Sequence, residues 1–300
     1  MTIMPGESRL TYLSVSNPSP APFALPRRTG RSLPPGRHRS PHRLTLPSDA
    51  PALVLAVPGA ARPASEEVAG EIAAAAGMSC SGAEVRVGYL EGRAQRLADA
   101  LVFDASAAAN AALRAVVVPL LAGPHPRLDA AIADLVGQAA APIILAAPLG
   151  PHPLMAEALH ARLAEAGLAR ESRARGLSIV GTANGVVVLA DRGDAAIKAA
   201  GVTAVLLAAR LAAPALPASL GDPKGIDTAL LRLRDAGVSR PAIASCIIGP
   251  ETDPDELAAA SARTGAPCSR PLATHPAIGQ LVAMRYGAAL ADLRLAGSPG

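Results

Sequence analysis

The sequence predicts an α/β fold with two similar domains, each a parallel sheet flanked by helices. From residue 51 onward, short apolar runs typical of buried strands alternate with longer Ala- and Leu-rich segments typical of helices. A length of 300 residues, 50% of them hydrophobic, is enough for two domains of ordinary size. The segment PLGPHP at 148–153 is matched by PLATHP at 271–276, which indicates that a whole domain is duplicated.

Residues 1–50 differ from the rest of the chain, and we expect them to be a disordered tail rich in proline and arginine. They contain nine prolines and seven arginines, and they cannot bury enough apolar surface to offset the entropy of ordering. This tail accounts for the net charge of +4, so the remainder is close to neutral. With no Trp, 3 Tyr and 2 Phe, the chain also lacks flat side chains on which bases stack. We therefore expect no nucleic-acid partner.

The first predicted domain spans residues 51–168. Continuous apolar runs such as Val116 to Val118 are typical of parallel strands that are covered on both faces. The same reasoning predicts strands at 52–57, 84–90, 115–121 and 142–147. The segments between and after them predict helices at 64–76, 93–113, 127–136 and 153–166. Alternation of this kind builds a parallel sheet, because right-handed crossovers place the helices on its faces.

The second predicted domain spans residues 177–296 and repeats this scheme. A charged segment at 170–175 is expected to be the linker or the end of a helix. Strands are predicted at 186–190, 204–208, 242–248 and 267–270. Helices are predicted near 194–200, 224–236, 254–263 and 276–294.

The segment at 114–129 holds the best-placed candidates for chemistry. Its apolar run ends at a Gly-Pro pair and is followed by His125, Arg127 and Asp129 at alternate positions. Open α/β sheets bind ligands beyond the carboxyl ends of their strands, so His125 is a candidate metal ligand or base. The alternative is an exposed or structural histidine. Arg127 is suited either to binding a carboxylate or to pairing with Asp129.

Other polar residues have simpler interpretations. His152 and His275 each precede a proline at the start of a predicted helix, which favours a capping role. Asp191 and Asp194 are also expected to cap a helix, although a carboxylate pair beside a loop is able to bind a cation. Motifs of serine hydrolases, P-loop proteins, Rossmann dinucleotide-binding proteins and zinc proteases do not occur.

Location follows from the cysteines and from the apolar runs. Three scattered cysteines without a CxxC motif fit reduced thiols in the cytoplasm. The apolar segments are broken by proline, glycine or charge, so the sequence predicts no membrane span. The N-terminus lacks the apolar core of a secretory signal. We therefore expect a cytoplasmic protein with no membrane partner.

Four stretches together carry a resemblance to a known family: VGYLE at 87–91, VVVPLLAGPHPRLD at 116–129, APLGPHPLMAEAL at 147–159, and APCSRPLATHPAIGQLVAMRY at 266–286. The chain resembles the sirohydrochlorin chelatases, the small cobaltochelatases and ferrochelatases, in a two-domain form. The resemblance implies two chelatase-like domains and a lyase that inserts Fe²⁺ or Co²⁺ into sirohydrochlorin, on the way to siroheme or cobalamin. The divalent metal and the tetrapyrrole are then the substrates, and no organic cofactor is implied.

The resemblance also assigns residues. In that family a His after the first strand and a His after the third strand hold the metal, and an acidic residue follows the second strand. His125 matches the third-strand position and Glu91 the acidic position, so both are implied as catalytic and metal-binding residues. Arg127 is placed to bind a carboxylate arm of the substrate. The first position departs from the pattern, because Pro58 stands where the family has His and Ala60 where it has Ser.

The loss at Pro58 leaves two alternatives to an enzyme. One is a catalytically impaired relative that binds tetrapyrrole or metal as a carrier. The other is a structural or regulatory homologue that binds neither. Glu91 also has a simpler interpretation, as an exposed charge at the start of a helix.

Overall fold

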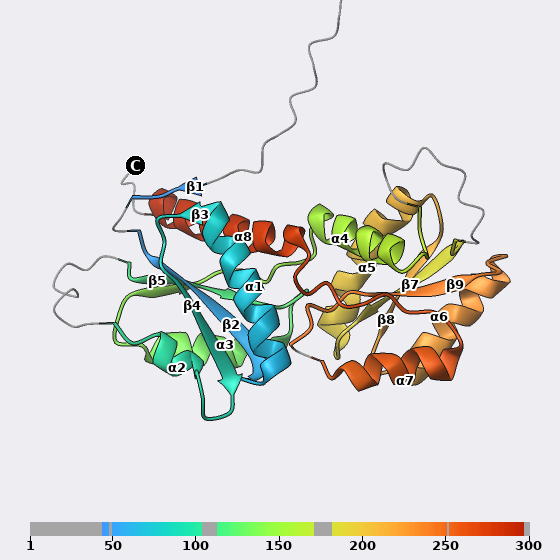
Figure 1. The fold of residues 1–300 in the computed structure, drawn as a ribbon, viewed down its shortest axis with the longest axis horizontal. Helices are drawn as coiled ribbons and strands as arrows, with labels where there is room; N and C mark the ends of the chain where they lie inside the picture. The colour runs from blue at the N-terminus through green and yellow to red at the C-terminus, as the bar shows by residue number, and fades with distance from the viewer. Residues whose placement is uncertain (1–43, 48–49, 104–112, 171–181, 251, 297–300) are drawn as a thin grey trace, which may run out of the picture. The chain divides into compact units, whose positions relative to one another are not determined.

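The computed structural model describes residues 44–47, 50–103, 113–170, 182–250 and 252–296 (Figure 1). Nearly all of the predicted tail, and residues 171–175 of the predicted linker, lie outside these ranges. The described part contains two parallel sheets with helices packed against them, as the sequence predicts (Figure 1). Within it, no helix combines the length and the apolar character needed to cross a membrane.

The first sheet has four parallel strands in the order β4-β2-β5-β6. Their bounds are β2 Ala52–Ala60, β4 Val85–Glu91, β5 Ala115–Pro119 and β6 Ile143–Leu145. The inner strands β2 and β5 are buried along almost their whole length, which explains their continuous apolar composition. A short pair, β1 Leu44–Thr45 and β3 Cys80–Ser81, lies apart from this sheet.

The helices of this half are α1 Pro63–Ser79, α2 Leu97–Ala100, α3 Pro126–Gln138 and α4 Pro153–Glu165. Three of them match predicted helices closely. The helix predicted at 93–113 is wrong over its described part, because only α2 is helical there. Residues 104–112 of that prediction lie outside the described ranges. Alanine-rich composition favours a helix but does not fix where it ends.

The second sheet has three parallel strands in the order β8-β7-β9. The strands are β7 Gly185–Ala190, β8 Ala215–Ser219 and β9 Pro241–Ser245. The helices are α5 Asp194–Leu211, α6 Pro223–Asp235, α7 Pro254–Thr264 and α8 Pro276–Ala296. The strand predicted at 267–270 is reduced to a single parallel bridge between Cys268 and Ile243.

The strand predicted at 204–208 is wrong, because these residues lie in the middle of α5. The second strand of this sheet is β8, whose sequence ALPAS contains Pro217. A proline argues against a central strand, but β8 is at the edge of the sheet, where one unpaired position costs little. A short apolar run cannot by itself distinguish a buried strand from a buried helix segment.

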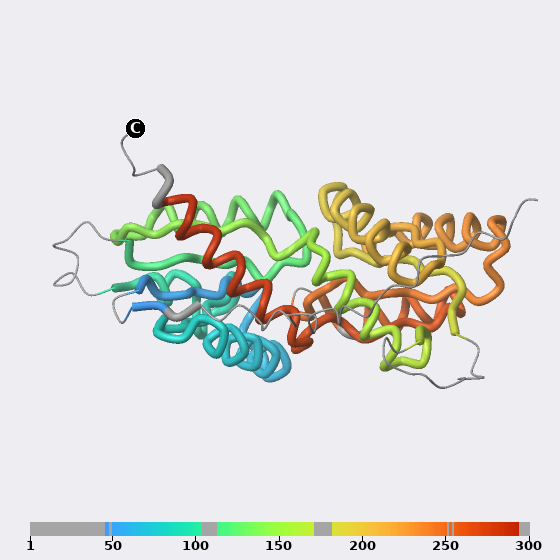
Figure 2. The backbone as a smooth tube through the Cα atoms, turned by 90° about the horizontal axis from the view of Figure 1, so that it is seen from above, coloured from blue at the N-terminus to red at the C-terminus, as the bar shows by residue number. Residues whose placement is uncertain are grey.

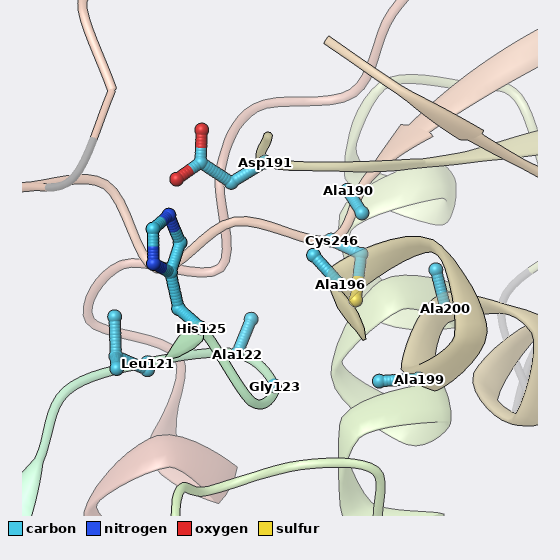
Figure 3. A pocket seen from close by; sticks show the side chains of 10 residues that line it. All are labelled: Leu121, Ala122, Gly123, His125, Ala190, Asp191, Ala196, Ala199, Ala200 and Cys246. Atoms are coloured by element: carbon cyan, nitrogen blue, oxygen red, sulfur yellow. The ribbon is translucent and has the colours of Figure 1, made fainter. Parts of the chain in front are cut away.

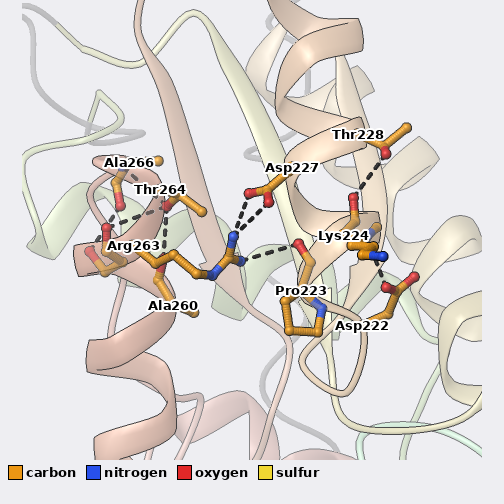
Figure 4. A network of polar contacts seen from close by, with 11 residues as sticks. Asp222, Pro223, Lys224, Asp227, Thr228, Ala260, Arg263, Thr264 and Ala266 are labelled. Atoms are coloured by element: carbon orange, nitrogen blue, oxygen red, sulfur yellow. Dashed lines mark hydrogen bonds and ion pairs between the residues drawn. The ribbon is translucent and has the colours of Figure 1, made fainter.

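Two helices of the second half are joined by a polar network on the surface. Arg263 of α7 donates to both carboxylate oxygens of Asp227 in α6, at 2.6 and 2.7 Å, and to the carbonyl of Pro223 at 3.2 Å (Figure 4). These bonds fix α7 relative to α6. The same helix α7 carries Glu256, which contributes to the candidate site described below.

The first three strands of each half have the same order in their sheets, with the first strand between the second and the third, and the first sheet has a fourth strand, β6, next to the third. The hydrogen bond that follows the last residue of the third strand is also equivalent in the two halves. Leu120 N–H donates to Ala56 O at 2.9 Å, and Cys246 N–H donates to Leu189 O at 2.8 Å. Ala56 and Leu189 are therefore equivalent positions. Two residues further on, Asp191 occupies in the second half the place that Pro58 occupies in the first.

The last helix of each half packs across the molecule. Helix α4 contacts α5 and β9 of the second sheet, and α8 contacts α1 and β5 of the first. Figure 2 shows α8 running back alongside the first half. Tyr286 of α8 donates its hydroxyl to Pro51 O at 2.6 Å, just before β2. The domain limits 51–168 and 177–296 stay a prediction, and the packing of α4 and α8 crosses them.

The close approach of α8 to α1 gives a test of this packing. A Cβ at Gly279 would lie 2.6 Å from the Cβ of Ala75 and 3.2 Å from its backbone carbon. We expect Gly279→Ala to lower the free energy of unfolding by about 1–3 kcal/mol, because the two helices must move apart. Gly70→Ala in α1 is the matched control, since no atom lies within 4 Å of its added Cβ. For Gly70→Ala we expect the free energy of unfolding, measured by urea titration, to rise by about 0.5–1 kcal/mol. Equal effects of the two substitutions would contradict the packing described.

Candidate functional site

A cleft of about 690 Å³ lies where the strands of both sheets end. The first half contributes Pro58, Glu91 and His125, from the ends of β2, β4 and β5. The second half contributes Asp191 after β7 and Gly249 after β9. The carboxyl ends of parallel strands are where open α/β sheets bind their ligands. This cleft is therefore the candidate site.

His125 is held at the edge of the cleft by the start of α3. It is the N-cap of that helix, and its Nδ1 accepts a hydrogen bond from Leu128 N–H at 3.3 Å. Its own backbone N–H donates to the Asp129 carboxylate at 2.8 Å. Asp129 thus positions His125, and no ion pair joins it to Arg127 in the described residues. The cap leaves the far edge of the imidazole ring facing the cavity (Figure 3).

The other predicted site residues reach the same cleft. Glu91 is the exposed last residue of β4, and Arg127 is exposed in the first turn of α3. Strand β2 separates Glu91 from His125 in the sheet. Over the described ranges, no three His, Cys, Asp or Glu side chains are close enough to form a ready-made metal site. The assignment of His125, Glu91 and Arg127 to metal and substrate stays a prediction.

Asp191 is the residue that sequence reasoning underestimated. It does not cap α5, whose N-cap is Gly193, and it instead lines both the large cleft and a small cavity with His125. Its carboxylate faces the imidazole ring of His125 (Figure 3). Two residues from opposite halves thus meet here. The signal that would have found Asp191 is its equivalence to Pro58, and that requires the strand registers.

The carboxylate of Asp191 lacks a full set of partners. Its Oδ1 atom is buried and accepts no hydrogen bond. The Arg192 guanidinium is 3.9 Å away, and it donates instead to both oxygens of Glu256 at 2.8 Å. Burial raises the pKa of the Asp191 carboxyl, and the backbone N–H of Arg192 and the charge of His125 partly oppose this rise.

His152, His275 and Cys80 have structural roles. The Nδ1 atoms of His152 and His275 accept hydrogen bonds from Leu154 N–H at 3.1 Å and Ala277 N–H at 3.2 Å, as expected for capping residues. Burial lowers the pKa of both imidazoles. Burial also raises the pKa of Cys80 to about 11, so this thiol stays protonated near neutral pH.

Five arginines line the cleft alongside four acidic residues, Glu91, Asp191, Asp253 and Glu256. The arginines are Arg62, Arg127, Arg162, Arg192 and Arg270. Three of them are held by carboxylates within the chain, since Glu165 binds two and Glu256 the third. Arg62 and Arg127 have no ion pair within the described part of the chain. These two guanidinium groups are therefore available to an anionic ligand.

Comparison with known proteins relates part of the chain to a known family. A model of the CbiX family matches residues 52–166, which include the first sheet, Glu91 and His125. This segment, less than half of the chain, is therefore similar to the CbiX family. No curated protein sequence matches the chain. The CbiX-family segment ends within one residue of the end of α4.

Two solved structures extend the likeness beyond the CbiX-family segment. The sirohydrochlorin chelatase SirB from Bacillus subtilis subspecies spizizenii, in complex with cobalt, is 14% identical with a TM-score of 0.58, over 82% of this chain and 97% of that chain. SirB from Bacillus subtilis with Fe³⁺ is 18% identical with a TM-score of 0.61, over 82% of this chain and 98% of that chain. At these identities the matches show the fold. Both halves of the chain therefore share the SirB fold.

The contact between Asp129 and His125 gives a prediction for this loop. Asp129→Ala removes the acceptor of the His125 N–H and a negative charge from the first turn of α3. We expect the free energy of unfolding to fall by about 1 kcal/mol in urea titrations. Asp134→Ala, at an exposed position of the same helix, is the control and should change it by less than about 0.5 kcal/mol. An Asp129→Ala variant with an unchanged free energy of unfolding would show that this contact does not hold the loop.

Proposed function

We propose that this protein is a sirohydrochlorin chelatase, which inserts Fe²⁺ or Co²⁺ into a reduced tetrapyrrole. The observation that carries the proposal is His125 at the third-strand exit of a CbiX-family segment, beside a cleft lined by arginines. The two SirB structures with cobalt and Fe³⁺ support it, since the chain shares their fold. No disulfide joins the three cysteines, all of which lie in the described part of the chain, and this supports a cytoplasmic location.

The proposed chemistry exchanges two pyrrole N–H protons for one divalent ion. Imidazole suits both parts of this exchange, because it binds Fe²⁺ or Co²⁺ and also titrates near neutral pH. His125 first holds the ion and, once the ion has passed to the ring nitrogens, accepts a proton. Glu91 accepts the other proton from its place in the same cleft. No redox change occurs, so the reaction requires no organic cofactor.

The proposed substrate fits the charge of the cleft. Sirohydrochlorin carries carboxylate arms around its ring, and guanidinium groups bind carboxylates through paired N–H donors. Arg127 and Arg62 are the cleft arginines without an ion pair in the described ranges. Binding of the arms orients the ring so that its nitrogens lie near His125. A volume of about 690 Å³ suits a ligand of this size.

The test of the proposed function is anaerobic metalation of sirohydrochlorin, followed by absorbance with Co²⁺ and with Fe²⁺. We choose His125→Asn because asparagine is a good N-cap and removes only the imidazole. We expect its rate to fall by about 100-fold or more, to that of a blank without protein. His152→Asn is the matched control, because it changes an equivalent cap on α4 and does not line the cleft. Wild-type protein that reacts no faster than the blank would overturn the proposed function.

The role of Arg127 is tested by its effect on substrate binding. Arg127→Gln removes one guanidinium group that would bind a substrate carboxylate, and it leaves His125 and Glu91 in place. We expect KM for sirohydrochlorin to rise by about 10-fold, equivalent to about 1.4 kcal/mol, with little change in kcat. Arg234→Gln, an exposed position on α6 away from the cleft, is the matched control. A fall in kcat with unchanged KM would place Arg127 in the chemical step instead.

A further inference from the structure

Within the described residues, one oxygen of the Asp191 carboxylate is left without a hydrogen-bond donor. Its side chain is only 17% exposed, and Oδ1 is buried without a hydrogen bond. The nearest cation, Arg192, is held by the two bonds to Glu256. An ionised carboxylate in such a place costs free energy unless a cation or a proton donor compensates it. The site is therefore arranged for a positive ligand.

The imidazole of His125 is able to supply one ligand of a binding site for such a cation. Because Nδ1 accepts the Leu128 N–H, the neutral ring carries its proton on Nε2, on the edge that faces Asp191 (Figure 3). A metal ion that binds at Nε2 takes the place of this proton. The ring proton then moves to Nδ1, which requires loss of the Leu128 bond. That bond is long at 3.3 Å and is a modest cost beside a metal–ligand bond.

The space beside this pair suits a single ion. The cavity that His125 and Asp191 share measures about 20 Å³, close to the volume that holds one water molecule. Most of its other lining is alanine, from β7 and α5. Cys246 also lines the cavity, but its sulfur lies apart from the His125 and Asp191 side chains (Figure 3). The charged and nitrogen ligands are thus concentrated at one point.

The duplicated topology explains why this ligand comes from the second half. Pro58 has no group able to bind a metal, and it stands at the carboxyl end of the first strand of the first sheet. Asp191 stands at the equivalent place of the second sheet, as the hydrogen bonds of Ala56 and Leu189 show. Both positions line the same cleft. A carboxylate from one half is therefore available where the other half has lost a ligand.

We propose that Asp191 is a ligand of the substrate metal ion, which is held between His125 of the first half and Asp191 of the second. This inference rests on the proposed function for the identity of the ion. Glu91 then acts mainly as a proton acceptor, since β2 separates it from His125 in the sheet. A neutral nitrogen and a carboxylate oxygen are a donor set that Fe²⁺ and Co²⁺ both accept.

The experiment is a titration of the full chain with Co²⁺ alone, followed by the visible absorption of the bound ion and by calorimetry. We compare wild type with Asp191→Asn, which keeps the size of the side chain and removes its charge. We expect Asp191→Asn to weaken Co²⁺ binding at least about 10-fold and to change the absorption spectrum. Asp194→Asn, three residues further on, exposed and outside the cleft lining, is the matched control and should bind like wild type.

Thermal unfolding separates a ligand from a structural residue. Without metal, Asp191→Asn removes a mostly buried charge whose Oδ1 accepts no hydrogen bond, so its Tm should equal or exceed that of wild type. With Co²⁺, the rise in Tm seen for wild type should be lost. A structural role would instead lower Tm without metal. Co²⁺ binding by Asp191→Asn that matches wild type, or wild type that binds no Co²⁺, would overturn the proposal.

The two proposals fail in different ways. If wild type binds Co²⁺ through Asp191 but does not metalate sirohydrochlorin, the proposed metal-binding site is supported and the proposed function is wrong. If wild type metalates sirohydrochlorin and Asp191→Asn does so with unchanged affinity for Co²⁺, the proposed function is supported and the proposed metal-binding site is wrong.

Discussion

The candidate site depends on a hydrophobic core that the two sheets share. The largest cluster of buried side chains includes Leu55 and Val118 of the first sheet together with Val188 of the second. Tyr286 of α8 and Leu159 of α4 belong to the same cluster. Because α4 and α8 each pack across the molecule, the halves are joined through buried apolar surface. A shared core fixes the strand ends of one sheet relative to those of the other, and this places His125 opposite Asp191.

Electrostatics at the cleft follow from α6 and α7, whose buried residues belong to a second hydrophobic cluster. The network of Arg263 and Asp227 fixes α7, which carries Glu256 (Figure 4). Glu256 in turn binds Arg192 in two places and so keeps it 3.9 Å from Asp191. A closer Arg192 would neutralise the carboxylate by a charge-assisted hydrogen bond. The contact with Glu256 therefore leaves the Asp191 carboxylate without a close guanidinium partner in a cleft that five arginines line.

The sequence predicted the parts of this fold that depend on local pattern. Continuous apolar strands, proline at helix starts and the caps His152 and His275 are local features, and the structure confirms them. Errors arose where one sequence pattern fits both a strand and a helix. The apolar run at 204–208 fits either, and it lies in a helix. The edge strand β8 was not predicted, because Pro217 argues against a strand. The crossing of α4 and α8 is set by tertiary packing, which periodicity does not record.

The same distinction applies to the site. His125 was predictable because it follows a buried strand and matches a family position, whereas Asp191 looked like one more helix cap. Its importance arises from long-range facts: the shared topology of two sheets, a buried oxygen without a partner, and a histidine from another part of the chain. None of these is visible in a window of neighbouring residues. Residues that complete a site between duplicated halves are therefore better sought by register than by motif.

A metal-binding site with only two protein ligands suits a metal ion that is a substrate. Structural metal sites close four protein ligands around the ion and hold it permanently, whereas a site that acts on its ion keeps open positions. Between His125 and Asp191 the ion would keep water in its other positions, and ring nitrogens can replace that water one at a time. Each protein ligand then has only one bond to give up, and His125 regains a lone pair just as a pyrrole proton must leave. On this reasoning, Pro58 at the position where the resemblance implies a histidine is compatible with the proposed catalysis, provided that Asp191 supplies the second ligand.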